Sequence, residues 1–501
     1  MNRLTSFKNN IFVSVYLYKD IRVLRLLILG FSSGIPILLI FSTLSLWLKS
    51  AGLERSTITL FSWAGLAYSF KFLWAPLIDR LPIYFLSKKL GHRKSWLAVS
   101  QICIVMLLFS IGFIDPMKSL FLMALIIVLI GFCSATQDAL VDTYRIESAP
   151  ENMQSVLSSI YVIGYRLGMI TSGAGSLILA SYLGGDTEIY NPLAWQLTYM
   201  LMALIQSLGL ICCLMSPEPI GKRNLINNFS EQSRLLTVFL FSILSFISIF
   251  IFFPDLNSKD PFISALITFS KFSIGFFVSW LTFTFLIKIN LLKKEIISST
   301  FYDPFKDFIN KYGKLTLIII IIIGVYRISD IVLGVIANIF YVDQGYTILQ
   351  IASFSKFWGL IATILGGIAG GLLSSKYKVL SVLFLGGILS SSSNILFAVI
   401  SIIPKDPLYL FLVIVADNFS GGIASVAFVA FLSSLTNKKF TTTQFALFTS
   451  MMVFIPKLIG GYSGSIVDTV GYFWFFIFTT LLGLPVLFLI HRLIKNIKLK
   501  V

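Results

Sequence analysis

Residues 235–253 read LLTVFLFSILSFISIFIFF, an apolar stretch without a single charge. A helix needs about 20 mostly apolar residues to cross the hydrocarbon core of a bilayer, so this stretch predicts a membrane-spanning helix. Similar runs recur along the whole chain of 501 residues, of which 57% are hydrophobic and 12% charged. A soluble domain is about 25% charged. The composition therefore excludes a water-soluble fold and predicts an all-α polytopic membrane protein.

Apolar runs between polar breaks predict 14 transmembrane helices in the order six, two, six. They cover residues 25–48, 57–78, 95–114, 119–144, 154–183, 194–215, 235–253, 262–289, 315–341, 347–373, 379–403, 408–435, 442–468 and 471–492. This order is typical of a transporter built from two six-helix halves with an inserted pair. We expect five segments: a cytoplasmic N-terminal segment (1–24), an N-terminal bundle (25–215), a linker with two extra helices and an amphipathic connector (216–314), a C-terminal bundle (315–492) and a cytoplasmic tail (493–501).

The two halves also resemble each other locally. The run YRLGMITSGAG (165–175) aligns with IPKLIGGYSGS (455–465), which places Arg166 opposite Lys457. An internal repeat of this kind is what a duplicated six-helix transporter predicts.

Basic residues are distributed unequally between the two predicted sides. Of the 39 Lys and Arg residues, 27 lie at the termini and in the loops on their side, 5 lie in the opposite loops and 7 lie within spans. Cytoplasmic loops retain positive charge, so both termini are predicted to be cytoplasmic. The net charge of +17 forms no single basic face, which argues against nucleic-acid binding.

The sequence offers no metal or disulfide framework. The 4 cysteines fall inside apolar runs, and there are only 2 histidines. We therefore expect no metal and no cofactor.

Charges within the predicted spans are the main functional signal, because each costs about 2.5–3.5 kcal/mol at mid-membrane unless it is paired, hydrated or used. The cations are Lys71, Arg166, Lys271, Lys288, Arg327, Lys356 and Lys457, and the acids are Asp138, Asp142, Asp330 and Asp417. Spacings of three and four residues place Asp138, Asp142 and Arg145 on one helix face, and Arg327 and Asp330 on another. These faces are predicted to line a cavity or contact a helix. The alternative for Arg327 and Asp330 is a local ion pair that only makes the helix insertable.

Asp79 and Arg80 end the second predicted span and precede a basic loop. An acid near helix ends and a basic loop could lock a cytoplasmic mouth closed, and plain interfacial anchoring explains the pair equally well.

Eight ordered motifs resemble the bacterial muropeptide permease family of the major facilitator superfamily. They are LILGFSSGIP (27–36), FKFLWAPLIDR (70–80), CSATQD (133–138), YRLGM (165–169), VYRISD (325–330), GLIATILGGIAGG (359–371), the region from DNFSGG (417–422) to SSLTNKKF (433–440), and TTQFALF (442–448). The resemblance implies a major facilitator fold and the import of N-acetylglucosaminyl-anhydro-N-acetylmuramic acid, with or without its stem peptide, in symport with protons. It implicates Lys71, Asp79, Gln137, Asp138, Asp142, Tyr165, Arg166, Arg327, Asp330 and Lys356. Two departures from one member of that family stand out: that member has Lys where Arg327 stands and Glu where Asp417 stands.

These observations give three sets of candidate residues for alternating-access transport. The substrate-binding candidates are Lys71, Gln137, Tyr165, Arg166, Arg327, Asn338, Lys356, Asn394, Asn418 and Lys457. The proton-coupling candidates are Asp138, Asp142, Asp330 and Asp417, with Asp138 preferred. The gating candidates are Asp79, Arg80 and Arg145.

Two other functions stay open. A transporter of the same fold could carry another bulky anion, such as an acyl-CoA or a nucleotide-sugar. An integral-membrane transferase is disfavoured because no loop exceeds about 25 residues and no histidine lies within a span. We expect a non-enzymatic monomer in a bacterial inner membrane, with an anionic glycopeptide, protons and membrane lipid as its partners.

Overall fold

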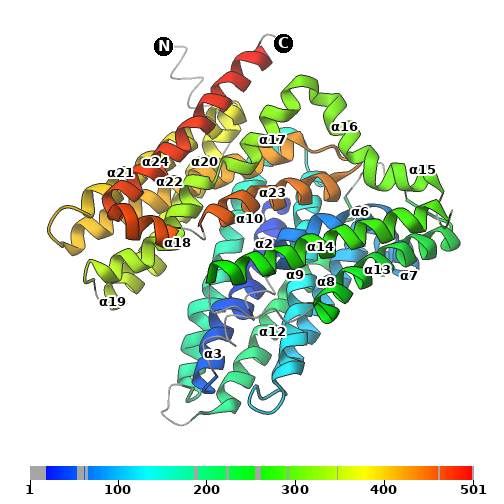
Figure 1. The fold of residues 1–501 in the computed structure, drawn as a ribbon, viewed down its shortest axis with the longest axis horizontal. Coiled ribbons are helices and arrows are strands. Elements are labelled where there is room, and N and C mark those ends of the chain that lie inside the picture. The colour runs from blue at the N-terminus through cyan, green and yellow to red at the C-terminus, as the bar shows by residue number, and fades with distance from the viewer. Residues whose placement is uncertain are drawn as a thin grey trace. The chain divides into compact units, whose positions relative to one another are not determined.

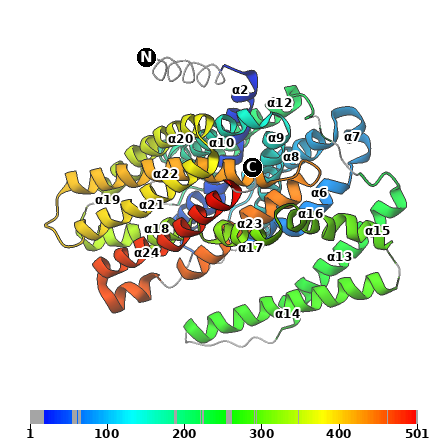
Figure 2. The ribbon, with the colours of Figure 1, turned by 90° about the horizontal axis from the view of Figure 1, so that it is seen from above.

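The computed structural model describes residues 19–53, 61, 66–185, 190–219, 221, 225–253, 261–289, 291, 293–346, 348–460 and 463–498, and every regular element in them is a helix (Figures 1 and 2). The chain divides into two compact units. The smaller unit comprises Pro76–Pro82 and Arg223–Lys311, and the larger unit holds the rest.

The larger unit combines helices from both ends of the chain. Its N-terminal part contains α2 (Ile21–Leu38), η1 (Leu39–Thr43), α3 (Leu44–Ser50), α5 (Leu66–Phe70), η3 (Lys71–Leu73), α7 (Tyr84–Leu90), α8 (His92–Ile111), α9 (Leu120–Glu147), α10 (Glu151–Ile170), η4 (Thr171–Gly175), α11 (Ser176–Tyr182) and α12 (Pro192–Met215). Its C-terminal part contains η6 (Gly313–Leu315), α17 (Thr316–Val325), α18 (Ile328–Asp343), α19 (Ile348–Ile351), η7 (Ala352–Trp358), α20 (Gly359–Lys376), α21 (Val379–Ile400), α22 (Pro407–Leu435), α23 (Thr441–Gly460) and α24 (Ser463–Lys498).

The smaller unit contains most of α6 (Ala75–Arg80), together with α13 (Phe229–Phe252), α14 (Pro261–Lys288), α15 (Lys294–Ile297), η5 (Ser298–Tyr302) and α16 (Asp303–Tyr312). Helices α13 and α14 lie along each other (Figure 2), joined by aromatic contacts such as Phe246 with Phe276, whose ring centroids are 5.0 Å apart. Near the ends of this pair, Lys293 forms an ion pair with Glu231 at 2.7 Å. The hydrogen bond to Glu231 raises the pKa of Lys293.

Twelve helices of the described part are long and apolar enough to cross a membrane, so the chain is a multi-pass membrane protein. Two predicted spans have no counterpart among them. The first, 57–78, lies partly outside the described residues, and its remainder is divided among α5, η3 and α6 instead of forming one helix. The second, 442–468, contains α23 and extends past residues 461–462, which also lie outside that part. The number 14 therefore stays a prediction, as does the division into two six-helix bundles.

Several helices are interrupted where the sequence contains proline or glycine. Pro36 lies inside α2, just before the π-helical turn η1, and Pro456 lies inside α23. Proline removes a backbone donor and clashes with the preceding turn, so it bends a helix. Helix α24 changes direction at Gly471, whose φ of 78° favours glycine.

Helices α20 and α22 pack closely because both present glycine at their contact. A Cβ atom on Gly366 would overlap the Phe419 carbonyl oxygen, and one on Gly422 would overlap the Thr363 carbonyl oxygen. Helix α10 contacts both α2 of the N-terminal part and α20 of the C-terminal part (Figure 1). The two halves of the sequence therefore meet along α10.

Two adjacent glycines of α22 give a matched test of this packing. We expect Gly422→Ala to lower the free energy of unfolding by about 1–3 kcal/mol, because the added methyl group overpacks the contact with α20. Gly421→Ala should be neutral or stabilising by up to about 1 kcal/mol, because nothing lies within 4 Å of the position that its methyl group would take. Thermal unfolding of the purified variants in detergent measures both. Equal melting temperatures would contradict the close approach.

Candidate functional site

A cavity of about 450 Å³ lies between the two sequence halves of the larger unit. Helices α2, α9 and α10 line it from the N-terminal part, and α22 and α23 line it from the C-terminal part. Its walls are mostly apolar and aromatic, and five charged side chains face it. These are Lys71, Asp138, Asp142, Arg166 and Arg327. A concave apolar site with a few charged groups is the usual form of a small-molecule site.

The two acids of the cavity lie one helical turn apart on α9, as their spacing predicts. Asp142 pairs with Arg145 at 3.2 Å. Asp138 is 7% exposed, and one of its carboxylate oxygens is buried without a hydrogen-bond donor among the described residues. The buried Lys71 ammonium acts electrostatically on both carboxylates. Asp138 is thus the less completely paired of the two acids.

Arg166 brings a guanidinium from α10 to the cavity. Within the part of the chain that the structure describes, this group makes one hydrogen bond, from Nη1 to Met169 Sδ at 3.7 Å. A guanidinium has five N–H donors in a planar fork that matches a carboxylate. The remaining donors of Arg166 are therefore available to a ligand in the cavity. Tyr165, the preceding residue, also lines the cavity.

Arg327 reaches the cavity from the turn between α17 and α18. Its Nε lies 3.0 Å from Asp330 Oδ2, and its Nη1 donates to Ser425 Oγ on α22. The Ser390 hydroxyl donates to Asp330 as well. The ion pair that the sequence offered as one interpretation is present, and Arg327 still faces the cavity. The two interpretations are compatible.

Several polar residues predicted to contact substrate lie elsewhere in the structure. The amide of Gln137 is fully buried and donates to Ser32 Oγ at 3.1 Å, which joins α9 to α2. Asn394 donates to Ser329 Oγ at 2.7 Å, and Asn418 accepts from Thr363 at 3.1 Å. None of the three lines the cavity, and each joins neighbouring helices.

The remaining candidates fall into two groups. Asp417 accepts a hydrogen bond from Ser393 at 2.9 Å and is absent from the cavity lining. Asn338 lies on α18, Lys356 in η7 and Lys457 on α23, and the side chains of these three residues are outside the described part of the structure.

The predicted gating pair Asp79 and Arg80 belongs to the smaller unit. Arg80 Nη2 donates to Ser299 Oγ at 2.7 Å, and the Arg80 carbonyl accepts from the Ile226 amide at 3.0 Å. Burial lowers the pKa of the Arg80 guanidinium, while Asp303 and Asp79 oppose this shift. These contacts attach the end of α6 to the connector.

Arg145, the third gating candidate, links the two halves of the sequence directly. Its side chain is fully buried, and its Nη1 donates to Ser158 on α10 and to Ser433 on α22, each at 2.8 Å. The guanidinium also lies 5.4 Å from the ring centroid of Phe445 on α23. One side chain therefore contacts helices from both ends of the chain.

Other hydrogen bonds join the halves on the same side. Thr143 Oγ1 lies 3.0 Å from Thr442 Oγ1, and Ser155 donates to the Ser374 carbonyl at 3.2 Å. One turn along α10, Ser159 donates to the Gly367 carbonyl at 2.8 Å. The first two of these bonds and the Arg145–Ser433 bond lie near loops 145–153, 374–378 and 436–441, which charge counting predicts to be cytoplasmic.

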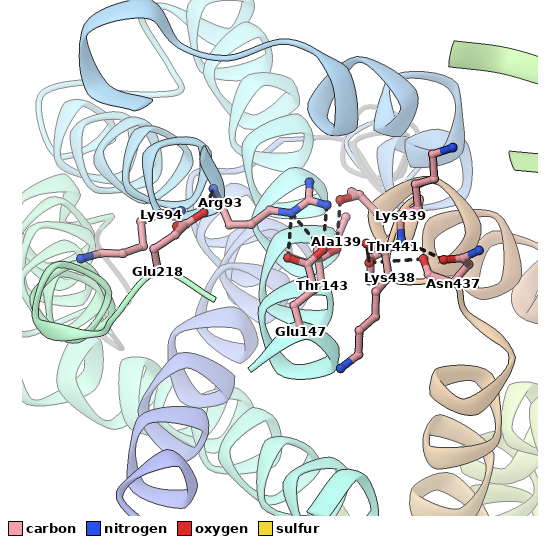
Figure 3. A network of polar contacts seen from close by, with 11 residues as sticks. Arg93, Lys94, Ala139, Thr143, Glu147, Glu218, Asn437, Lys438, Lys439 and Thr441 are labelled. Carbon is pink, nitrogen blue, oxygen red and sulfur yellow. Dashed lines mark hydrogen bonds and ion pairs between the residues drawn. The ribbon is translucent and has the colours of Figure 1, made fainter. Parts of the chain in front are cut away.

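A buried ion pair that the sequence did not reveal lies nearby (Figure 3). Arg93 Nη2 is 2.8 Å from Glu147 Oε1, and neither side chain is more than 1% exposed. Glu218 accepts from the amides of Arg93 and Lys94 at 3.0 Å each, at the start of α8. Figure 3 shows this pair beside Thr143 and the turn 437–441. The sequence contains one signal for this pair: Glu147 follows the long apolar run 119–144, and the basic segment 92–94 precedes the apolar run 95–114.

Comparison with known proteins decides the family. A family model described as acetyl-coenzyme A transporter 1 matches residues 22–124. The AmpG 4 protein of Rickettsia felis is 32% identical over 481 residues, covering 96% of this chain and 98% of that protein. The chain belongs to the AmpG family of transporters. The AmpG 1 protein of Rickettsia prowazekii is 30% identical over 475 residues, covering 95% and 98% of the two chains. The anhydromuropeptide permease of Escherichia coli is 28% identical over 476 residues, covering 95% and 80%.

Solved structures show the same fold as this AmpG-family chain. The major facilitator superfamily transporter FucP, in the outward conformation, aligns with a TM-score of 0.61 at 11% identity, over 94% of this chain and 98% of its own. The proton:xylose symporter XylE aligns with a TM-score of 0.59 at 12% identity, over 97% and 96%. The predicted major facilitator fold and family are confirmed. The chain is a transporter, and the transferase alternative is excluded.

Cysteine cross-linking can test the contact between the halves. We expect Thr143→Cys with Thr442→Cys to form a disulfide on oxidation, because their hydroxyl oxygens lie 3.0 Å apart, and to stop transport until the bond is reduced. The matched control is Thr43→Cys with Ser176→Cys. Their oxygens are also 3.0 Å apart, but both lie in the N-terminal half, so the cross-link should leave transport intact. Gel mobility and transport assays measure the two effects. If the oxidised Thr143→Cys and Thr442→Cys variant transported as fast as the same variant after reduction of the disulfide, this would contradict a gate at this contact.

Proposed function

We propose that the chain imports anhydromuropeptides, N-acetylglucosaminyl-anhydro-N-acetylmuramic acid with or without its stem peptide, in symport with protons. Similarity to the Escherichia coli anhydromuropeptide permease over 95% of this chain is the observation that carries the proposal. The protein would act as a monomer in the inner membrane with both termini in the cytoplasm, in agreement with the distribution of basic residues. It would use the proton gradient and no cofactor.

The charges of the cavity support an anionic substrate. Three cations and two acids line it. Asp142 is paired with Arg145 and Arg327 with Asp330, which leaves Lys71 and Arg166 against Asp138. Arg166 and Arg327 come from opposite halves and act on each other electrostatically. A carboxylate between these guanidinium groups would relieve their repulsion and bind both halves at once. The aromatic side chains Tyr68, Tyr161 and Tyr165 would pack against the sugar rings.

Proton coupling is assigned to Asp138. Keeping a buried carboxylate ionised costs free energy when its hydrogen bonds are incomplete, and binding a proton removes that cost. Protonation of Asp138 would therefore accompany one step of the transport cycle. Moving one charge through 100 mV supplies about 2.3 kcal/mol, enough for roughly fifty-fold accumulation. Asp142 and Asp330 remain secondary candidates because each is paired with an arginine. Asp417 remains one because it accepts a hydrogen bond from Ser393 and does not line the cavity.

The hydrogen bonds between the halves suggest which conformation this is. Arg145, Thr143 and Ser155 join the halves on the side predicted to be cytoplasmic. We assign an outward-facing state whose cytoplasmic gate is closed by these bonds. Alternating access would then require the two halves to rock apart there and close on the other side of the cavity.

A second candidate substrate class is another bulky anion, above all an acyl-CoA. The match of residues 22–124 to a family model described as acetyl-coenzyme A transporter 1 favours it. Uptake of radiolabelled anhydro-disaccharide into membrane vesicles, in competition with an unlabelled CoA thioester or nucleotide-sugar, separates the two. Uptake of the labelled disaccharide that the CoA thioester does not reduce would support the first proposal. No uptake of the disaccharide, with uptake of a labelled CoA thioester, would favour the second.

Replacing Arg166 tests the binding role. We expect Arg166→Gln to reduce uptake of the labelled disaccharide by about tenfold to hundredfold, because a hydrogen bond to a charged group contributes about 1.5–3 kcal/mol. Lys89→Gln is the matched control, since Lys89 is an exposed cation on α7, outside the cavity and outside the loops that lie beside the contacts between the halves. Initial rates in vesicles containing equal amounts of folded transporter provide the measurement. Unaltered uptake in the Arg166 variant would remove it from the substrate site.

Replacing Asp138 tests the coupling role. We expect Asp138→Asn to retain exchange of labelled for unlabelled substrate but to lose accumulation and sensitivity to a protonophore, because the amide cannot carry the proton. Asp406→Asn is the control. It removes an acid that caps α22, and asparagine caps a helix equally well. Accumulation that persists in the Asp138 variant and still collapses with the protonophore would assign coupling to another acid.

A further inference from the structure

A second hollow of the larger unit lies outside the transport cavity, at the outer surface of α2, α10 and α12. It measures about 470 Å³, and ten of its eleven lining residues are apolar, among them Leu24, Leu208 and Met215. The exception is Arg25. Leu24 is 52% exposed and Met215 is 78% exposed, so the hollow opens to the surroundings. We call it the Arg25 groove.

The Arg25 groove adjoins a polar hollow of about 310 Å³, because Arg25 lines both. The polar hollow is also lined by Arg22, Tyr144 and Ser148, and by two acids, Glu147 and Glu218. Both acids have partners: Glu147 pairs with Arg93, and Glu218 accepts from the amides that begin α8. The two hollows thus form one amphipathic site with Arg25 at the junction.

The two arginines of this site differ in their pairing. Arg22 is bound to Asp20 at 2.7 Å and donates to the Ser148 carbonyl at 3.3 Å. The nearby arginines lower the pKa of Asp20 to about 2, so its carboxylate stays charged and keeps Arg22 engaged. The Arg25 guanidinium has no hydrogen bond or ion pair to any residue that the structure describes. Its charge is available at the junction of the apolar and polar hollows.

The position of the site along its helices matches a membrane interface. The candidate spans Ile21–Leu48 and Pro192–Met215 begin and end at this site. The apolar hollow therefore faces hydrocarbon, and the polar hollow faces the headgroup region. An amphipathic molecule with a negative headgroup matches both parts, and anionic phospholipid is the abundant molecule of that chemistry in a membrane.

We propose that the Arg25 groove binds one anionic diacyl phospholipid, with an acyl chain along α2 and α12 and the phosphate at the Arg25 guanidinium. All the walls of the Arg25 groove belong to helices of the N-terminal half. Helix α2 packs on α10 through glycine, since a Cβ on Gly168 would overlap the Phe31 carbonyl oxygen. The lipid would therefore stay bound as the halves move. It would stabilise the N-terminal half and take no part in substrate binding, so the inference stands independently of the transported molecule.

The test uses the full chain purified in detergent and stripped of lipid. Phosphatidylglycerol, phosphatidylcholine with the same acyl chains, and inorganic phosphate are added separately while thermal unfolding is followed, and native mass spectrometry counts the lipids retained. We expect phosphatidylglycerol alone to raise the melting temperature, since a ligand that binds the folded state stabilises it, with one molecule retained per chain. An equal rise with phosphatidylcholine, or with phosphate alone, would overturn the proposal.

Two variants and a control define the site. Arg25→Gln should weaken phosphatidylglycerol binding about fivefold, the contribution expected of one basic residue near anionic lipid. Leu208→Trp should fill the groove and also weaken binding. Lys378→Gln, which removes an exposed cation elsewhere, should bind as the wild type does. Wild-type affinity for phosphatidylglycerol in both groove variants would overturn the assignment. Dimerisation of the wild-type protein that displaces the retained lipid would overturn it as well.

Discussion

A guanidinium keeps its charge even inside an apolar helical bundle, so burying it is costly unless acceptors surround it. Arg145 has three acceptors, one on each of three helices: Asp142 on α9, Ser158 on α10 and Ser433 on α22. Removing any partner would leave charge or polarity uncompensated in a dry environment. Because α9 and α10 come from the N-terminal half and α22 from the C-terminal half, satisfying this one side chain also holds the halves together.

The same group connects the contact between the halves to the cavity. Asp142 lines the cavity and pairs with Arg145, so one carboxylate of the cavity is bound to the side chain that joins the halves. Helix α10 contacts α20 directly, and Ser159 donates to the Gly367 carbonyl across this contact. The glycines of the same two helices pack within each half, those of α10 against α2 and those of α20 against α22. Close packing and polar pairing therefore depend on the same helices.

Residue pattern predicted the charged faces of the site better than its uncharged polar residues. Asp138, Asp142 and Arg166 line the cavity as expected, because a charge in a membrane bundle is costly unless it is paired, hydrated or used. Gln137, Asn394 and Asn418 were predicted to contact substrate but bond to neighbouring helices. An amide is equally well satisfied by a serine on an adjacent helix or by a ligand, so its presence in an apolar run does not distinguish the two.

Sequence alone determined that the chain spans the membrane many times and which charges are costly within a span, because hydrophobic length and charge distribution are properties of the chain itself. It also predicts which side of the membrane the loops occupy. Its motifs also identified the family. Only the tertiary structure decided which of those charges meet. The pairing of Arg93 with Glu147, the contact of Arg145 with Ser433 and the convergence of Arg166 and Arg327 on one cavity join residues far apart in the chain. Such pairs depend on how helices cross, and crossing is set by packing at glycine and by burial, which no local pattern records.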